Sequence, residues 1–117
     1  MLTIYHNPRC SKSRQTLELI KQHTTDNTDN LSVIEYLKTP LTVEEISSLI
    51  TQLNCSPIEM MRVKEAEFIA QNLKGSDDET LINAMANTPK LIERPIVSNG
   101  SRAIIGRPPE NVLTFFS

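Results

Sequence analysis

The residues best suited to carry chemistry lie in the segment HNPRCSKSR, residues 6–14. Cys10 stands there among Arg9, Lys12 and Arg14, and the segment contains no acidic residue. A thiol becomes a strong nucleophile when it ionises, and nearby positive charge or a helix N-terminus favours the thiolate. The same groups would bind an oxyanion beside the sulfur. This setting predicts a reactive thiol rather than a small buried hydrophobic residue.

The spacing around Cys10 excludes two familiar kinds of cysteine site. A dithiol motif CxxC needs a second cysteine at position 13, where Ser13 stands. A phosphatase loop of the form Cys-x5-Arg needs arginine at position 16, which is Thr16. The sequence therefore predicts a single nucleophilic thiol.

The other candidate metal ligands or thiols are Cys55, His6 and His23. Together with Cys10 they match no zinc-finger spacing, so we expect no metal. Two roles stay open for Cys55: a bystander, which we favour, or a distant thiol that resolves an intermediate. If Cys55 is a bystander, an external thiol must complete the reaction.

Three further arginines each follow an apolar stretch: Arg62, Arg94 and Arg107. Two of them, Arg94 and Arg107, directly precede a proline. A planar guanidinium group can bind two oxygens of a tetrahedral oxyanion at once. By residue type alone, an arginine more often lies on a solvated surface, so an oxyanion clamp and a surface role both stay open here.

The elements that hold these residues follow from hydrophobic periodicity. Residues 2–5 predict a buried strand, and residues 11–22 predict a helix that begins directly after Cys10. Polar residues 24–30 predict a loop, and residues 32–37 predict a second strand. The two strands should be parallel, because a helix connects them.

The middle of the chain predicts helices. Three N-cap signals mark them: Thr42 with Glu45, Ser56 before Pro57, and Ser76 with Glu79. Residues 95–98 and 102–105 flank Asn99-Gly100, a strong signal of an antiparallel hairpin. Pro108-Pro109 then opens a last short helix.

The resulting order is β-α-β, a helical block, and β-β-α. This order predicts an α/β thioredoxin-like fold with a mixed four-stranded sheet, as a single domain over residues 1–117 with a helical insertion at about 42–88. Such a fold places a cysteine at the start of its first helix, where Cys10 stands. The proline that opens its third strand is often cis and faces that cysteine. Pro95 occupies this place, which would aim Arg94 at Cys10.

Taken together, YHNPRCSKSR, Arg62, LIERPIV and GRPPE resemble the glutaredoxin-dependent arsenate reductase family over essentially the whole chain. The resemblance implies that Cys10 attacks arsenate to form a thiol–arsenic(V) ester, while Arg62, Arg94 and Arg107 bind the oxyanion. It also implies that glutathione attacks next, that glutaredoxin removes it as a mixed disulfide, and that arsenite leaves.

The resemblance also assigns supporting residues. Ser13 matches a serine that hydrogen-bonds the thiolate, and Arg14 belongs to the same motif. His6 matches the motif's histidine, which would add positive charge when protonated; a structural hydrogen bond is the equal alternative. Ser11-Lys12 replaces a glycine-threonine pair of plasmid-type members, so the preferred oxyanion stays open.

Two other functions stay open. A related branch of the superfamily contains redox-responsive regulators that bind RNA polymerase, although these typically carry CxxC. The second alternative function is that of a glutathione-linked thiol transferase without an oxyanion substrate. Arsenate reduction remains the function that we expect.

Composition limits the partners and the setting. The chain has 117 residues, with 12 basic and 14 acidic side chains and a net charge of −2, so no overall field attracts nucleic acid. We find no apolar run long enough for a membrane span and no signal-peptide pattern. With only two cysteines, a reducing, cytoplasmic setting is expected. The expected partners are arsenate or a similar oxyanion, glutathione and glutaredoxin, with no bound cofactor, and we expect a monomer.

Overall fold

The computed structural model describes residues 2–23 and 31–116, so the loop predicted at 24–30 lies outside the described residues. The chain divides into two compact units. The first combines Met1–Tyr36 with Arg94–Ser117, and the second is Leu37–Glu93. The second unit thus interrupts the first at nearly the place predicted for the helical insertion. That the two units make a single domain stays a prediction.

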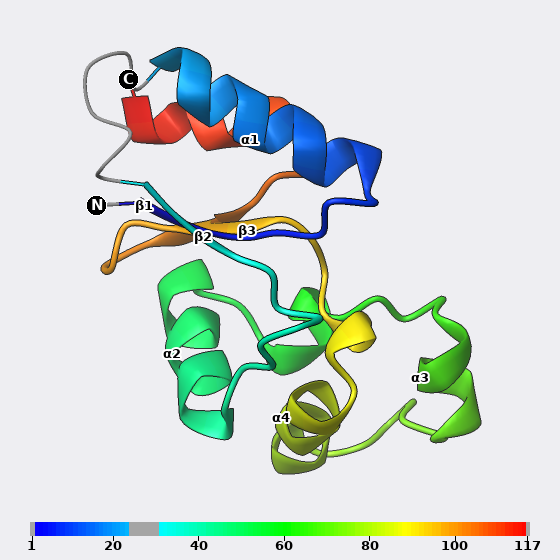
Figure 1. Ribbon diagram of the computed structural model, residues 1–117. Coiled ribbons are helices and arrows are strands. Elements are labelled where there is room, and N and C mark those ends of the chain that lie inside the picture. The colour runs from blue at the N-terminus through cyan, green and yellow to red at the C-terminus, as the bar shows by residue number, and fades with distance from the viewer. Residues whose placement is uncertain (1, 24–30, 117) are drawn as a thin grey trace. The chain divides into compact units, whose positions relative to one another are not determined.

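A mixed four-stranded sheet forms the centre of the first unit (Figure 1). Its strands are β1 (Leu2–Tyr5), β2 (Leu31–Ile34), β3 (Ile96–Ser98) and β4 (Ala103–Ile105), in the order β2-β1-β3-β4. β1 pairs parallel with β2 and antiparallel with β3, and β3 pairs antiparallel with β4. The predicted mixed sheet and the predicted parallel pair are both confirmed.

Strand β2 begins and ends earlier than the predicted residues 32–37. Its last residue, Ile34, pairs with Tyr5, the last residue of β1. The His6 N–H then donates to the Ile34 carbonyl at 2.8 Å. The segment after β1 then turns at Pro8. It therefore provides no extended backbone with which residues after Ile34 could pair.

Two helices cover one face of this sheet. They are α1 (Ser11–His23) and the 3₁₀ helix η4 (Pro109–Phe116), which pack side by side (Figure 1, blue and red). The residues buried at the centre of this packing are Ile4, Ile20, Val97 and Val112. The predicted first helix is confirmed to within one residue. The predicted last helix is a 3₁₀ helix, and at its start Asn111 N–H donates to the carbonyl of Pro108, three residues back, at 3.0 Å.

The hairpin between β3 and β4 turns at residues 99–102. Asn99 N–H donates to the Arg102 carbonyl at 3.0 Å, and Asn99 Oδ1 accepts the N–H groups of Ser101 and Arg102. Gly100 has a φ of 96°, which glycine adopts readily. The hairpin predicted from Asn99-Gly100 is confirmed, with a loop longer than a two-residue turn.

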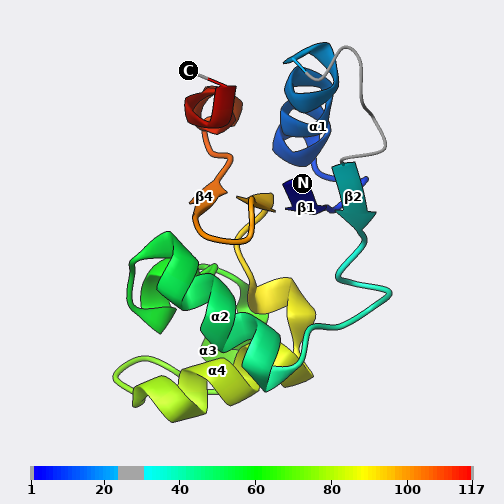
Figure 2. The ribbon, with the colours of Figure 1, turned by 90° about the vertical axis from the view of Figure 1, so that its left-hand side faces the viewer.

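The second unit is helical, as predicted for the middle of the chain (Figure 2). Its elements are α2 (Val43–Leu53), η2 (Pro57–Met60), α3 (Ala66–Ala70), α4 (Asp78–Asn87) and η3 (Pro89–Leu91). Helix α4 contacts α2 and both short 3₁₀ helices. Helix α3 escapes prediction, because five residues are too few to show a helical period.

Of the N-caps predicted in the second unit, the one at Thr42 is confirmed and the one at Ser76 is wrong. Thr42 and Glu45 form the expected capping box, with reciprocal bonds of 3.0 and 3.1 Å. The cap predicted at Ser76 is wrong, because the Asp77 carboxylate accepts the Thr80 N–H at 2.8 Å and caps α4 instead. Ser76 and Asp77 are adjacent, and both residue types are good N-caps. The negative carboxylate of Asp77 also interacts favourably with the helix N-terminus.

Candidate active site

Cys10 occupies the N-cap position of α1. The Arg14 N–H donates to the Cys10 carbonyl at 3.0 Å, which is the first hydrogen bond of the helix. The N–H groups of Ser11, Lys12 and Ser13 come before this bond and have no carbonyl partner within the helix. Those of Ser13 and Lys12 interact with the Cys10 sulfur and favour its thiolate. A serine or aspartate oxygen usually accepts such bonds. Here a sulfur takes that place, at the positive end of the helix dipole.

The surroundings lower the pKa of Cys10. Partial burial is the largest single effect and acts in the opposite direction, since it penalises the charged thiolate and raises the pKa. The backbone N–H groups of Ser13 and Lys12 and the guanidinium groups of Arg94 and Arg107 together outweigh burial. The predicted direction, toward the thiolate, is therefore confirmed.

Arg94 and Arg107 approach Cys10 from the two ends of the β3–β4 hairpin. Arg94 lies before Pro95, at the entry to β3, and Arg107 follows β4; both Arg–Pro peptide bonds are cis, as expected for Pro95. The Gly106 N–H donates to the Pro95 carbonyl at 2.9 Å, so the two arginine-bearing segments run side by side. The Nε of Arg94 is buried and has no hydrogen-bond partner among the described residues. Such a donor is suited to an anion.

The basic side chains next to Cys10 in sequence do not act as predicted. The charges of Arg9, Lys12 and Arg14 are not among the causes of the lowered pKa of Cys10. All three residues are exposed, and water screens the charge of exposed, flexible side chains. Arg14 instead donates from Nη1 to the Pro8 carbonyl at 3.0 Å, which links the helix to the preceding turn.

Ser13 and His6 form a buried pair at the start of α1. His6 Nδ1 lies 2.7 Å from Ser13 Oγ, and the Asn7 N–H donates to the same oxygen at 3.0 Å. The hydroxyl is thus engaged on the side of His6 and Asn7. Ser13 acts on the Cys10 sulfur through its backbone N–H, in agreement with the bond to the thiolate that the resemblance implies.

The pKa of His6 is lowered, chiefly by burial. Glu35 opposes this, while the positive charges of Lys21 and Arg14 add to it. An ordinary histidine already loses its proton below pH 7, so His6 is mainly neutral at neutral pH. Of the two roles predicted for His6, the structural hydrogen bond therefore agrees with the structure, whereas an added positive charge does not.

Asn7 is a contributor that the sequence reasoning missed. Its carbonyl accepts the Cys10 N–H at 3.0 Å, its side chain accepts the Arg9 N–H at 3.0 Å, and its N–H donates to Ser13. Asn7 therefore shapes the turn that carries the thiol. The signal was present in the sequence, because asparagine before proline commonly organises a turn through its side chain.

Arg62 and Cys55 belong to the second unit. Arg62 Nη1 forms an ion pair with Glu65 at 2.9 Å, and its N–H donates to the Leu91 carbonyl at 2.8 Å. Its place in an oxyanion clamp stays a prediction.

Burial, and the nearby negative charge of Glu59, raise the pKa of Cys55. A thiol that resists ionisation agrees better with a bystander than with a resolving cysteine.

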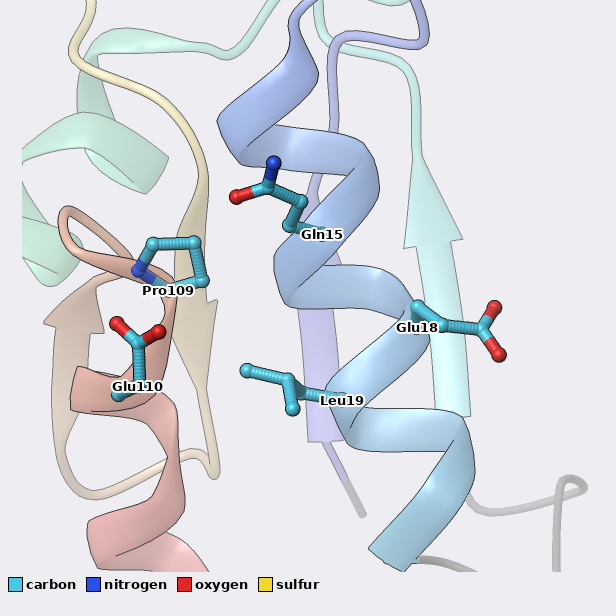
Figure 3. A pocket seen from close by; sticks show the side chains of 5 residues that line it. All are labelled: Gln15, Glu18, Leu19, Pro109 and Glu110. Carbon is cyan, nitrogen blue, oxygen red and sulfur yellow. The ribbon is translucent and has the colours of Figure 1, made fainter.

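A pocket of about 290 Å³ lies between α1 and η4 of the first unit (Figure 3). Its lining residues are Gln15, Glu18, Leu19, Pro109 and Glu110. None of the predicted site residues lines it, and its two carboxylates would repel an anion.

Among the described residues we find no group of three or more His, Cys, Asp or Glu that could hold a metal ion. No helix within residues 2–23 and 31–116 has the length and apolar character of a membrane span.

Comparison with known proteins shows similarity over nearly the whole chain. Residues 5–115 match the family model described as the ArsC family. The uncharacterized protein YfgD of Escherichia coli K12 is 47% identical over 113 residues, covering 94% of this chain and 92% of that protein. The arsenate reductase of Haemophilus influenzae is 43% identical over 114 residues, covering 94% of each chain.

The solved structures that are most similar share the fold as well. The structure of the arsenate reductase from Vibrio cholerae has a TM-score of 0.88 and 48% identity, covering 97% of this chain and 95% of that chain. The α/β thioredoxin-like fold class predicted from the order of elements is therefore confirmed.

Proposed function

This chain belongs to the ArsC family, and we propose that it is an arsenate reductase with Cys10 as its nucleophile. One observation carries the proposal: a thiol with a lowered pKa caps α1, and Arg94 and Arg107 place their charges beside it. Similar proteins from Haemophilus influenzae and Vibrio cholerae are named arsenate reductases, which supports the reaction.

In the first step the ionised Cys10 sulfur attacks the arsenic of arsenate. A sulfur–arsenic bond forms, and one arsenate oxygen leaves as water after taking up protons. Arg94 and Arg107, with Arg62 as a third proposed member, hold the remaining oxygens and stabilise their negative charge. Phosphate has the same shape and charge, so selectivity must arise from the readiness of sulfur to attack arsenic.

The second step needs electrons from outside the chain. Conversion of arsenic(V) to arsenic(III) takes two electrons, which two thiols supply when they become a disulfide. Cys10 has Ser13 where a CxxC partner would stand, and the pKa of Cys55 is raised. We therefore assign both thiols to external partners: glutathione, which bonds to the arsenic with loss of water, and glutaredoxin.

A glutaredoxin thiolate then attacks the glutathione sulfur and leaves with it as a mixed disulfide. The electron pair of the broken arsenic–sulfur bond stays on arsenic, and water releases arsenite and the Cys10 thiol. Glutathione is a co-substrate in this scheme, and no bound cofactor takes part. The scheme suits a reducing cytoplasm and a monomeric protein.

Replacement of Cys10 tests the assignment. We expect Cys10→Ser to reduce arsenate with glutathione and glutaredoxin at roughly the uncatalysed rate, because a hydroxyl at this position is neither ionised nor a good nucleophile. The control Cys55→Ser should stay within about twofold of the wild type. Equal turnover by Cys10→Ser and the wild type would refute the nucleophile.

The same assays separate the other functions. Arg94→Ala should raise the KM for arsenate at least about tenfold. Exchange with a glutathione mixed disulfide should stay nearly unchanged when it is compared at high pH, where Cys10 is ionised in both proteins. Exchange activity without arsenate reduction would favour a thiol transferase. Capture of RNA polymerase subunits, with no arsenate turnover, would favour a regulator.

A further inference from the structure

Gly106 lies in a place where no larger residue fits. A Cβ added there would stand 2.7 Å from Thr16 Oγ1, 2.9 Å from Thr16 Cγ2 and 3.0 Å from Pro95 Cγ. The other two glycines, Gly75 and Gly100, have positive φ angles and open space around them. Gly106 is therefore required by close packing and not by backbone conformation.

Hydrogen bonds connect the same three residues. The Gly106 N–H donates to the Pro95 carbonyl at 2.9 Å. The Thr16 hydroxyl lies 2.8 Å from the Lys12 carbonyl and 3.3 Å from the Gly106 carbonyl. A hydroxyl has one proton, so the shorter bond, within α1, dominates. The contact between Thr16 and Gly106 is chiefly steric, with a weak shared hydrogen bond.

Each member of this contact is connected to a residue of the proposed site. Gly106 directly precedes Arg107, Pro95 directly follows Arg94, and Thr16 lies on the helix that Cys10 caps. Thr16 is fully buried, on the same helix face as Ser13. The contact thus joins the two arginine-bearing segments to the helix whose N-terminus holds the thiol.

We infer that Thr16 and Gly106 are positioning residues: their contact sets how far the guanidinium groups of Arg94 and Arg107 stand from the Cys10 sulfur. The inference rests on the proposed role of Cys10 as the nucleophile. Displacing closely packed atoms costs free energy. A methyl group at position 106 needs contacts of about 3.5 Å or more, so the segment must move by roughly 0.5–1 Å. Movement away from α1 weakens the interaction that favours the thiolate.

The test compares Gly106→Ala, Thr16→Ala and the double variant, all in a Cys55→Ser background so that one thiol reacts. The control is Thr51→Ala, because Thr51 Oγ1 makes the same kind of bond within α2, to the Ser47 carbonyl at 3.2 Å, and is exposed. The readouts are the rate of iodoacetamide alkylation as a function of pH, and KM and kcat with sodium arsenate.

We expect Gly106→Ala to shift the alkylation profile to higher pH and to slow alkylation at pH 7 by about 3- to 10-fold. Its KM for arsenate should rise by about tenfold. The difference in alkylation should vanish at high pH, where every variant is ionised; a merely structural defect would persist there. Thr16→Ala should shift the profile less and toward lower pH, because loss of its side chain lets the segment of Gly106 move closer to α1. Thr51→Ala should not shift it.

The double variant gives the sharpest result. Removal of the Thr16 side chain vacates the space that the new methyl group at position 106 needs, so the profile should return at least halfway to that of the parent. If the profile of the double variant does not return toward that of the parent, the positioning role of the contact is overturned. Unchanged profiles in both Gly106→Ala and Thr16→Ala would overturn it as well. If Gly106→Ala does not fold, an unchanged profile in Thr16→Ala overturns it.

The two proposals fail in different ways. Absence of arsenate turnover in the wild type would refute the proposed function, while the alkylation profiles would still report on the contact between Thr16 and Gly106. Normal turnover together with unchanged alkylation profiles would refute the positioning role alone.

Discussion

The positive charge that acts on Cys10 comes from residues distant in the chain. Arg94 and Arg107 lower its pKa, whereas the charges of Arg9 and Arg14, its neighbours in sequence, are not among the causes. Local backbone supplies the rest, through the N–H groups of Lys12 and Ser13. The thiol is therefore prepared by the helix N-terminus together with two arginines of the hairpin.

Removal of either arginine should make Cys10 less reactive at neutral pH. A positive charge favours the thiolate and lowers its pKa, so Arg94→Ala and Arg107→Ala should each move the alkylation profile to higher pH. At pH 7 the rate should fall by roughly 2- to 10-fold, more for Arg94→Ala because its effect on the pKa is the larger. Alkylation of Cys10 followed across pH gives the measurement.

Arg9→Ala is the matched control for this prediction, since it removes an adjacent charge that does not act on the pKa. Its profile should coincide with that of the wild type. A shift in Arg9→Ala as large as that in Arg94→Ala would contradict the structural explanation and restore the one drawn from sequence neighbours.

Among the secondary-structure elements, helix α1 has a buried face that is polar near the thiol and apolar farther along. Its buried residues are Ser13, Thr16 and Ile20. Ser13 bonds with His6, Thr16 contacts Gly106, and Ile20 belongs to the core. The first two turns of α1 therefore organise the site, and the later turns contribute hydrophobic stability.

The N-caps of the second unit allow a clean stability comparison. Thr42→Ala removes the side-chain bond that caps α2 and should lower the free energy of unfolding by about 0.5–2 kcal/mol. Ser56→Ala is the control, because Ser56 precedes η2 but makes no capping bond with its side chain. It should change stability by less than about 0.5 kcal/mol. Urea denaturation measures both, and equal losses would argue against the capping box.

For the whole molecule, the open question is whether the two compact units unfold together. The proposal of a single domain with a helical insertion requires one cooperative transition. The core of the first unit offers a way to perturb one unit alone, because Ile20 is fully buried there.

Ile20→Ala should destabilise the protein by about 2–5 kcal/mol, since it leaves a cavity in a packed core. If the two units unfold together, hydrogen exchange should accelerate in α2 of the second unit as well as in β1 of the first. Val33→Ala, at a residue 44% exposed on β2, is the control and should have little effect. Faster exchange confined to the first unit would show that the units unfold separately.

Much of this protein was readable from local patterns in its sequence. The start of α1 directly after Cys10, the hairpin around Asn99-Gly100 and the capping box at Thr42 depend on residues close in the chain. The parallel strand pair followed from the helix that connects its two strands. Periodicity, turn residues and cap residues encode such features directly, because the interactions that form them are local.

Tertiary structure alone decided which groups act on the thiol. The approach of Arg94 and Arg107 to Cys10, and the contact of Thr16 with Gly106, join segments far apart in the chain. The engagement of the Ser13 hydroxyl with His6 likewise depends on how the turn before α1 folds back. Distances of this kind are set by how helix and sheet pack, and no local pattern specifies them.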